Sequence, residues 1–191
     1  MNLVIKQRAS LVEAVMAFFL LMTNYQEKGY LSRAITRTNL QTLRNRFRDY
    51  MRKAKLFIKD PSQGLLVVAK KNGVVVGTVC AEFNPTHTPI EEVFPDELRE
   101  LRNSAQSFVY LGSFAVASSY QCTRLSLRML RDLWSLVKEK GIDIGICVVH
   151  PDHSTFYERF GFTVIALSTA TPGLRSAPAA LLVIKRHAVR L

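Results

Sequence analysis

Hydrophobic residues in the first third of the chain recur at helical spacing. Ser10 and Glu13 form a capping box, in which a serine hydroxyl and a glutamate three residues later satisfy free amides at a helix start, and an apolar run follows over 11–23. From Asn39 the apolar positions form a stripe with steps of three and four residues: Leu40, Leu43, Phe47, Tyr50, Met51 and Ala54. This spacing is typical of an amphipathic helix. We therefore predict a helix over 11–23 and a second helix that begins near Asn39.

Short β-branched runs take over after residue 64. The runs 65–70 and 74–83 flank Asn72-Gly73, a pair that tolerates positive φ and favours a β-hairpin. Four further runs predict strands: 108–116, 142–149, 162–167 and 180–185. The run 142–149 is apolar enough to be buried on both faces. A Pro/Gly-containing segment separates the last two strands.

Three helices are expected among these strands. The first begins at Pro95, within the acidic stretch 89–103. The second is indicated over 124–140 by apolar residues at helical spacing, and it stops at Gly141. The third is short; it follows Asp152 and ends at Gly161. The strand-helix-strand unit over 108–149 implies a parallel pair joined by a right-handed crossover. The expected fold is therefore α+β, with a mixed sheet.

The chain has 191 residues, enough for a substantial core without disulfides or metals. No repeat or linker interrupts it, so we expect one domain over 1–191, with a helical part over 1–60 and a sheet core over 61–191. The most apolar stretch, 11–22, contains Glu13 and is far shorter than the roughly 20 residues that cross a bilayer. No cleavage site follows before Asn24 and Tyr25, which argues against a signal peptide. These features predict a cytoplasmic protein without a transmembrane segment.

The net charge of +11 is concentrated in one segment. Residues 31–59 hold nine Lys/Arg and one acid, a local net charge of +8, whereas residues 82–100 have a net charge of −5. Such asymmetry indicates a polyanionic partner, although a solvated helix face explains it equally well. Neither an aromatic platform nor zinc-finger spacing accompanies the basic segment, so nucleic acid is not the expected partner.

The cysteines and histidines do not form a metal pattern. Cys80, Cys122 and Cys147 are odd in number and far apart, and both Cys80 and Cys147 lie in apolar runs typical of buried core cysteines. His150 and His153 have helical spacing, but Asp152 is the only nearby carboxylate and no third ligand follows. We therefore expect no metal site.

A motif near the C-terminal end resembles a known family. His150-Pro151 followed by 156–162 (FYERFGF) is similar to the signature of the GNAT acyltransferase superfamily, in which a helix after the fifth strand ends in FYExxGF. The segments 27–30 (EKGY), 89–98 (PIEEVFPDEL) with Leu101-Arg102, and 176–182 (SAPAALL) are more narrowly similar to the N-acyl amino acid synthases, relatives of the acyl-homoserine-lactone synthases. The resemblance covers nearly the whole chain.

This resemblance implies a fold and a donor site. The GNAT fold has a central, mostly antiparallel sheet with a splayed parallel strand pair, flanked by helices, and the parallel pair corresponds here to 108–116 and 142–149. The pantetheine arm of an acyl thioester lies between these strands and bonds their backbone as an added strand would. The implied donor-binding residues are Phe114, Ala115, Val116, Gln121, Cys122, Thr123, Arg124, Leu125 and Ser126.

Two departures from the family pattern stand out. Arg124 and Ser126 occupy positions where the superfamily's phosphate loop usually has glycines, so a coenzyme A pyrophosphate fits less easily than the single phosphodiester of acyl carrier protein. Tyr110 and Ser113 replace an acidic residue and an arginine that the synthases often carry on the preceding strand. We place both among the candidate substrate-binding residues.

The resemblance implies that Tyr157 is the general acid that protonates the leaving thiolate; a buried aromatic residue is the alternative interpretation. Backbone amides around Ala115 and Val116 would bind the thioester oxygen. Three candidates for the general base remain open: His150, His153 and Glu82. No resident cofactor is expected, and the donor is acyl-phosphopantetheine on acyl carrier protein, or acyl-CoA.

The first predicted helix is more apolar than one buried stripe requires. Core packing explains this composition; alternatively Phe18, Phe19, Met22 and Tyr25 line a slot for a long acyl chain, where each buried methylene contributes about 0.8 kcal/mol. Basic side chains are expected to bind the acidic carrier protein: Arg44, Arg48, Arg52, Lys55, Arg128 and Arg131.

The resemblance therefore implies an N-acyltransferase that moves a long acyl chain from acyl carrier protein to the amino group of an amino acid. Two alternatives remain open. One is an acetyl-CoA-dependent N-acetyltransferase, and the other is a degenerate GNAT fold that acts as a basic binding module.

Overall fold

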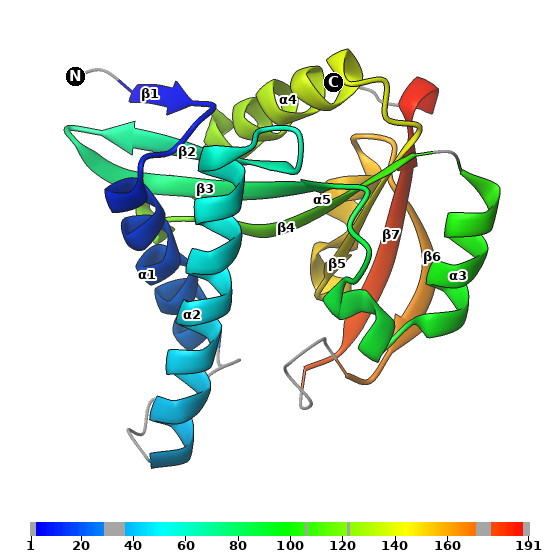
Figure 1. The fold of residues 1–191 in the computed structure, drawn as a ribbon, viewed down its shortest axis with the longest axis horizontal. Helices are drawn as coiled ribbons and strands as arrows, with labels where there is room; N and C mark the ends of the chain where they lie inside the picture. The colour runs from blue at the N-terminus through cyan, green and yellow to red at the C-terminus, as the bar shows by residue number, and fades with distance from the viewer. Residues whose placement is uncertain (1–2, 29–36, 106, 122, 171–176, 189–191) are drawn as a thin grey trace. The chain divides into compact units, whose positions relative to one another are not determined.

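The computed structural model describes residues 3–28, 37–105, 107–121, 123–170 and 177–188. Its strands form one seven-stranded sheet in the order β1-β2-β3-β4-β5-β7-β6 (Figure 1). The strands are β1 Leu3–Lys6, β2 Gly64–Lys71, β3 Val74–Phe83, β4 Phe108–Val116, β5 Ile144–Val149, β6 Thr163–Ser168 and β7 Ala179–Lys185. The α-helices are α1 Leu11–Glu27, α2 Arg37–Lys59, α3 Pro95–Ser104, α4 Arg124–Glu139 and α5 Ser154–Glu158. The predicted mixed sheet is confirmed, with β4 and β5 as its parallel pair.

Local sequence signals explain most of these elements. Ser10 and Glu13 form the predicted capping box at the start of α1. Asn72 and Gly73 have φ values of 52° and 82°, which a two-residue hairpin turn requires. Strand β1 was not predicted, because four residues at a sheet edge carry too little periodicity; it pairs antiparallel with Val68–Lys71 of β2. Helices α1 and α2 both extend beyond the limits of their apolar stripes.

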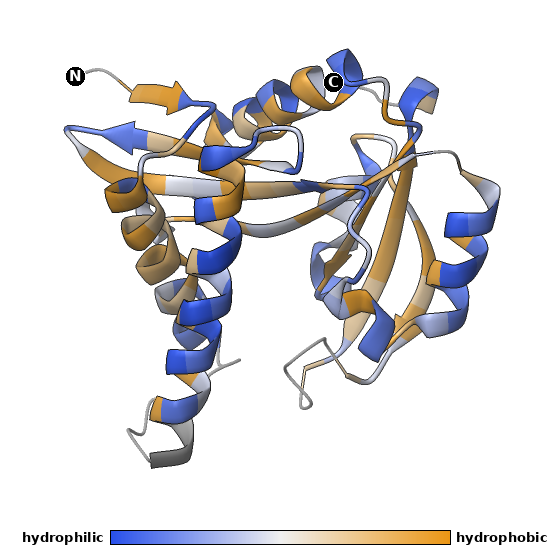
Figure 2. Ribbon diagram, in the orientation of Figure 1, coloured by the Kyte–Doolittle hydropathy of each residue, from blue (hydrophilic) through white to orange (hydrophobic). Residues whose placement is uncertain are grey.

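The contacts divide the chain into two compact units, 1–81 with 113–133, and 82–112 with 134–191. The single domain expected over 1–191 stays a prediction. In the first unit α1 and α2 cover one face of the hairpin, burying Ala14, Ala17, Met51, Ala54, Leu66 and Val68 in one cluster. Helix α4 covers the other face, where a Cβ added to Gly77 would lie 2.5 Å from Met129 Sδ. Figure 2 shows α1 mostly hydrophobic and α2 mostly hydrophilic.

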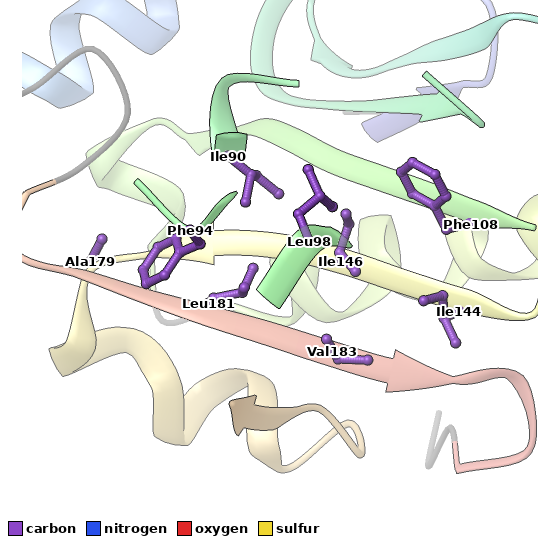
Figure 3. Packing of buried hydrophobic residues seen from close by; sticks show 9 residues of the cluster. All are labelled: Ile90, Phe94, Leu98, Phe108, Ile144, Ile146, Ala179, Leu181 and Val183. Atoms are coloured by element: carbon purple, nitrogen blue, oxygen red, sulfur yellow. The ribbon is translucent and has the colours of Figure 1, made fainter. Parts of the chain in front are cut away.

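The second unit has its own core (Figure 3). Ile90, Phe94 and Leu98, from the acidic segment and α3, meet side chains of β4, β5 and β7 in one buried cluster. Arg102 fixes the connection before α3, because its guanidinium donates to Pro85 O, Thr86 O and Glu91 Oε1. The 82–100 segment is thus part of this core. Among the described residues, no helix is both long and apolar enough to cross a membrane.

Candidate functional site

Strand β4 has an irregular backbone just beyond the residues that pair with β5. The β4–β5 ladder joins Phe108–Leu111 to Ile144–Cys147. Two residues beyond it, Ser113 has a φ of 52°, in the left-handed region that side-chain-bearing residues adopt infrequently. Such conformations gather at functional sites, where surrounding structure maintains them. The irregularity stands immediately before Phe114, Ala115 and Val116, the predicted donor-binding stretch.

Ala115 packs into an apolar cluster between β4 and α1. Its buried partners are Phe18, Leu21 and Met22, and four partly buried side chains surround them: Leu20, Tyr25, Leu43 and Tyr50. The structure thus brings together Phe18, Met22 and Tyr25 from the predicted acyl-binding set. Phe19 is 60% exposed and lies outside the cluster.

The loop after β4 is held by bonds within the first unit. Ala117 N donates to Val76 O (2.9 Å) on β3. The Gln121 side chain donates to Asn24 Oδ1 (3.2 Å) and to Val116 O (3.3 Å), while Ser118 Oγ donates to Glu27 Oε2 (2.5 Å). Gln121 therefore connects the end of α1 to the end of β4.

Helix α4 begins with a capped turn. Thr123 Oγ1 donates to Tyr120 O (2.6 Å) and accepts from Leu125 N (3.2 Å), so its hydroxyl is a helix cap. Other amides of a first helical turn lack intrahelical partners and can bind a phosphate oxygen. Arg124 is exposed and Ser126 half-buried at this turn, and the predicted Cys122 lies outside the described residues.

Two exposed basic stripes run along helices of the first unit. Arg44, Arg48, Arg52 and Lys55 recur along one side of α2. Arg124, Arg128 and Arg131 do the same on α4. Since α2 and α4 cover opposite faces of the hairpin, the predicted carrier-binding residues form two separate stripes rather than one surface.

Tyr157 lies in the second unit, in the aromatic turn that the FYERFGF segment forms. Its side chain is buried, and its ring packs edge-on against Phe156 and Phe162 with centroid distances of 5.2 and 5.6 Å. Its carbonyl accepts from Phe160 N (2.9 Å) and Phe162 N (3.3 Å), and Gly161 reverses the chain with a φ of 96°. These contacts fix the position of the Tyr157 backbone and ring.

The three candidate bases differ in their surroundings. His150 Nδ1 accepts from Asp152 N (3.3 Å), as an N-cap to the turn over Pro151–His153. His153 is exposed, 6.0 Å from the His150 ring between centroids, and Glu82 is half-buried on β3. Within the described ranges, no three His, Cys, Asp or Glu side chains gather as metal ligands.

Tyr110 belongs to the second unit. It packs at the edge of the second unit's core, and its ring lies over Gly112, where an added Cβ would be 3.2 Å from the ring. Gly112 therefore leaves room for the Tyr110 side chain.

Sequence reasoning missed a pair of buried hydroxyls in the first unit. Tyr50 OH and Thr78 Oγ1 are both buried, and neither finds a hydrogen-bond partner among the described residues. Burial raises the pKa of Tyr50, so the phenol keeps its proton, and interaction with the neighbouring Thr78 hydroxyl offsets part of this rise. In the sequence Tyr50 belongs only to an apolar stripe, and no sequence signal marks Thr78.

Residues 16–185 match the family model of the N-acyl amino acid synthase FeeM. The chain belongs to this family. As a member of a family of N-acyl amino acid synthases, the protein is an N-acyltransferase, which confirms the enzyme class that the sequence predicts. No curated protein matches the chain.

Solved structures agree with this family on the fold. FeeM, an N-acyl amino acid synthase from uncultured soil microbes, is 20% identical, with a TM-score of 0.74 over 97% of this chain and 92% of its own. PaiA N-acetyltransferase from Thermoplasma acidophilum, in complex with coenzyme A, is 14% identical, with a TM-score of 0.66 over 97% and 99%. yncA from Salmonella typhimurium, with its cofactor acetyl-CoA, is 17% identical, with a TM-score of 0.62 over 97% and 95%. The predicted GNAT fold is therefore confirmed.

Proposed function

We propose that this member of the FeeM family transfers a long-chain acyl group from acyl carrier protein to the amino group of an amino acid, in the cytoplasm and as a single domain. The observation that carries the proposal is the apolar cluster around Ala115, beside the strand end where a thioester would pair. An acyl chain of about fourteen carbons gains about 0.8 kcal/mol per buried methylene in such surroundings. An acetyl group would use almost none of this cluster.

The donor is assigned to the end of β4 and the start of α4. Backbone amides near Ala115 and Val116 are the proposed donors to the thioester oxygen as it becomes an oxyanion. The first turn of α4, capped by Thr123 and carrying Arg124, is the proposed site for the pantetheine phosphate. A single phosphodiester suits a turn with Arg124 and Ser126 in place of glycines.

Tyr157 is the proposed general acid. The amine attacks the thioester carbonyl and the C–N bond forms, which gives a tetrahedral oxyanion. When this species collapses, the C=O bond forms again, the C–S bond breaks, and the thiolate takes a proton from the phenol. The aromatic packing of Phe156 and Phe162 limits the freedom of the Tyr157 ring, which favours a positioned donor. A base must remove one proton from the amine, and His150, His153 and Glu82 remain the candidates.

Mass spectrometry of lipid extracts from bacteria that express the chain tests the proposal. We expect N-acyl amino acids to accumulate with the wild-type protein and to fall about ten- to a thousandfold with Tyr157→Phe, the range of general-acid contributions. Thermal unfolding of both purified proteins controls for loss of fold. Equal product from the two proteins would remove Tyr157 from the mechanism.

The absence of any N-acyl amino acid from wild-type cells would contradict the proposal. Purified protein would then be assayed with acetyl-CoA and a panel of amines, because turnover there would establish the N-acetyltransferase alternative. Salt-dependent binding of an acidic polymer without turnover would establish a basic binding module.

A further inference from the structure

Two buried hydroxyls are found at the apolar cluster that the proposed function gives to the acyl chain: Tyr50 packs against this cluster, and Thr78 lies next to Tyr50. Thr78 is fully buried on β3, and the Tyr50 ring lies 5.5 Å from the Phe18 ring between centroids. Leaving a buried hydroxyl without a partner costs about 1 to 3 kcal/mol. Neither group has one among the described residues, so an oxygen atom of a ligand would remove this cost.

The register of β3 and β4 places Thr78 beside the proposed thioester position. The bond from Ala117 N to Val76 O makes these two residues opposite neighbours in an antiparallel pair. Stepping two residues along each strand brings Ala115 opposite Thr78. Side chains at directly opposed positions lie about 4.5–5.5 Å apart, a distance that two or three carbon–carbon bonds span.

The surroundings limit which substrate group could bind there. The neighbours of Tyr50 are apolar, and they include Phe18, Met22 and Leu43. Apolar surroundings penalise a charged carboxylate and suit a neutral oxygen better. The hydroxyls themselves can both donate and accept.

We infer that Tyr50 and Thr78 form a subsite for an oxygen substituent close to the thioester end of the acyl chain, so that the enzyme selects 3-hydroxyacyl donors over unsubstituted ones. This inference rests on the proposed function. An unsubstituted chain would leave the two hydroxyls with no partner except each other next to its third carbon, whereas a 3-hydroxyl adds one. A difference of one such hydrogen bond corresponds to about tenfold in kcat/KM.

The test compares tetradecanoyl and 3-hydroxytetradecanoyl groups on acyl carrier protein. We expect the wild-type kcat/KM to be about tenfold higher for the 3-hydroxy donor. Tyr50→Phe and Thr78→Val remove one hydroxyl each with little change in shape, and each should bring the ratio of the two donors toward one. Thr78→Ser keeps a hydroxyl and should retain the preference.

Thr88→Val is the matched control, because the Thr88 hydroxyl is also buried and unpartnered but belongs to the second unit. It should keep the wild-type ratio. Using a ratio of two donors separates selectivity from a general loss of folding or activity.

Equal kcat/KM for the two donors in the wild-type protein would overturn the inference and leave the proposed function intact. An unchanged ratio in both Tyr50→Phe and Thr78→Val would overturn it too. If Tyr50→Phe and Thr78→Val instead raise the KM for the amino acid above the wild-type value, by the same factor with either donor, the hydroxyls belong to the acceptor site and the inference is overturned. Turnover of neither donor would contradict the proposed function itself.

Discussion

At the scale of single residues, Glu13 shows how one charge joins three segments. Its carboxylate is nearly buried, yet it accepts from Lys6 Nζ (2.8 Å) on β1, Lys70 Nζ (2.7 Å) on β2 and Ser10 N (2.6 Å). Burial alone would raise the pKa of Glu13, but these donors overcome that effect and lower it to about 2. The bonded form in the folded protein is therefore the carboxylate.

The contribution of Glu13 to stability is fully present above its unfolded pKa of 4.5 and is lost as the pH falls toward about 2. We expect Glu13→Gln to lower the free energy of unfolding by about 1–2 kcal/mol at pH 7, since both lysines are partly exposed and screened. Urea titrations of both proteins between pH 2 and 7 should converge near pH 2. If the difference in the free energy of unfolding between wild type and Glu13→Gln were the same at every pH, the lowered pKa of Glu13 would be refuted.

At the scale of elements, a glycine inside the second unit sets the contact between Trp134, near the end of α4, and strand β5. A Cβ on Gly145 of β5 would lie 2.7 Å from the Trp134 ring and 2.9 Å from Ile184 Cγ2. Both neighbours are buried, so neither can move away freely. Trp134 therefore packs directly on the backbone of β5.

Gly145→Val should destabilise the protein by about 1–3 kcal/mol, the usual cost of overpacking a core. The free energy of unfolding from urea denaturation measures this effect. Thr163→Val, an exposed position on β6, is the matched strand control and should change the free energy by less than about 0.5 kcal/mol. Equal stability of the two variants would show that Trp134 has room to repack.

Sequence periodicity was sufficient for elements that signal locally. The capping box, the Asn72-Gly73 turn and the strand-helix-strand unit each depend on neighbouring residues, and all three are confirmed. The left-handed Ser113 carries no such signal, because serine is not a residue selected for positive φ. The Gln121 contact to Asn24 and the Tyr50–Thr78 pair join residues far apart in the chain, so only the fold reveals them. The resemblance implies Tyr157 and the donor-binding residues, whereas composition and charge alone indicate the apolar and basic residues of the first two helices.

At the scale of the whole molecule, the excess of positive charge has a definite distribution. Of the two exposed basic stripes, the one on α4 begins beside the proposed phosphate site, and the one on α2 lies on the other face of the hairpin. Charge reversal can therefore separate binding of the phosphate from binding of the carrier protein.

We expect Arg48→Glu with Arg52→Glu to raise the KM for acyl carrier protein about tenfold and to leave the KM for a small acyl-phosphopantetheine donor unchanged. Arg124→Glu with Arg128→Glu should raise the KM for both phosphate-bearing donors. Steady-state kinetics at low salt measures this, since salt screens such contacts. Arg99→Glu with Lys185→Glu changes the net charge equally in the second unit and is the control. The same KM in wild type and the α2 variant would place the carrier elsewhere.

The order of strands also has a consequence for biosynthesis. Strand β7 pairs with both β5 and β6, so these two ladders require residues up to Lys185. A nascent chain that has emerged only as far as β6 therefore exposes the unpaired edges of two apolar strands. Unpaired edges of this kind promote association between chains. Strand β7 is made last in the second unit, and it covers the edges of β5 and β6. Chains truncated before β7 should therefore depend on chaperones.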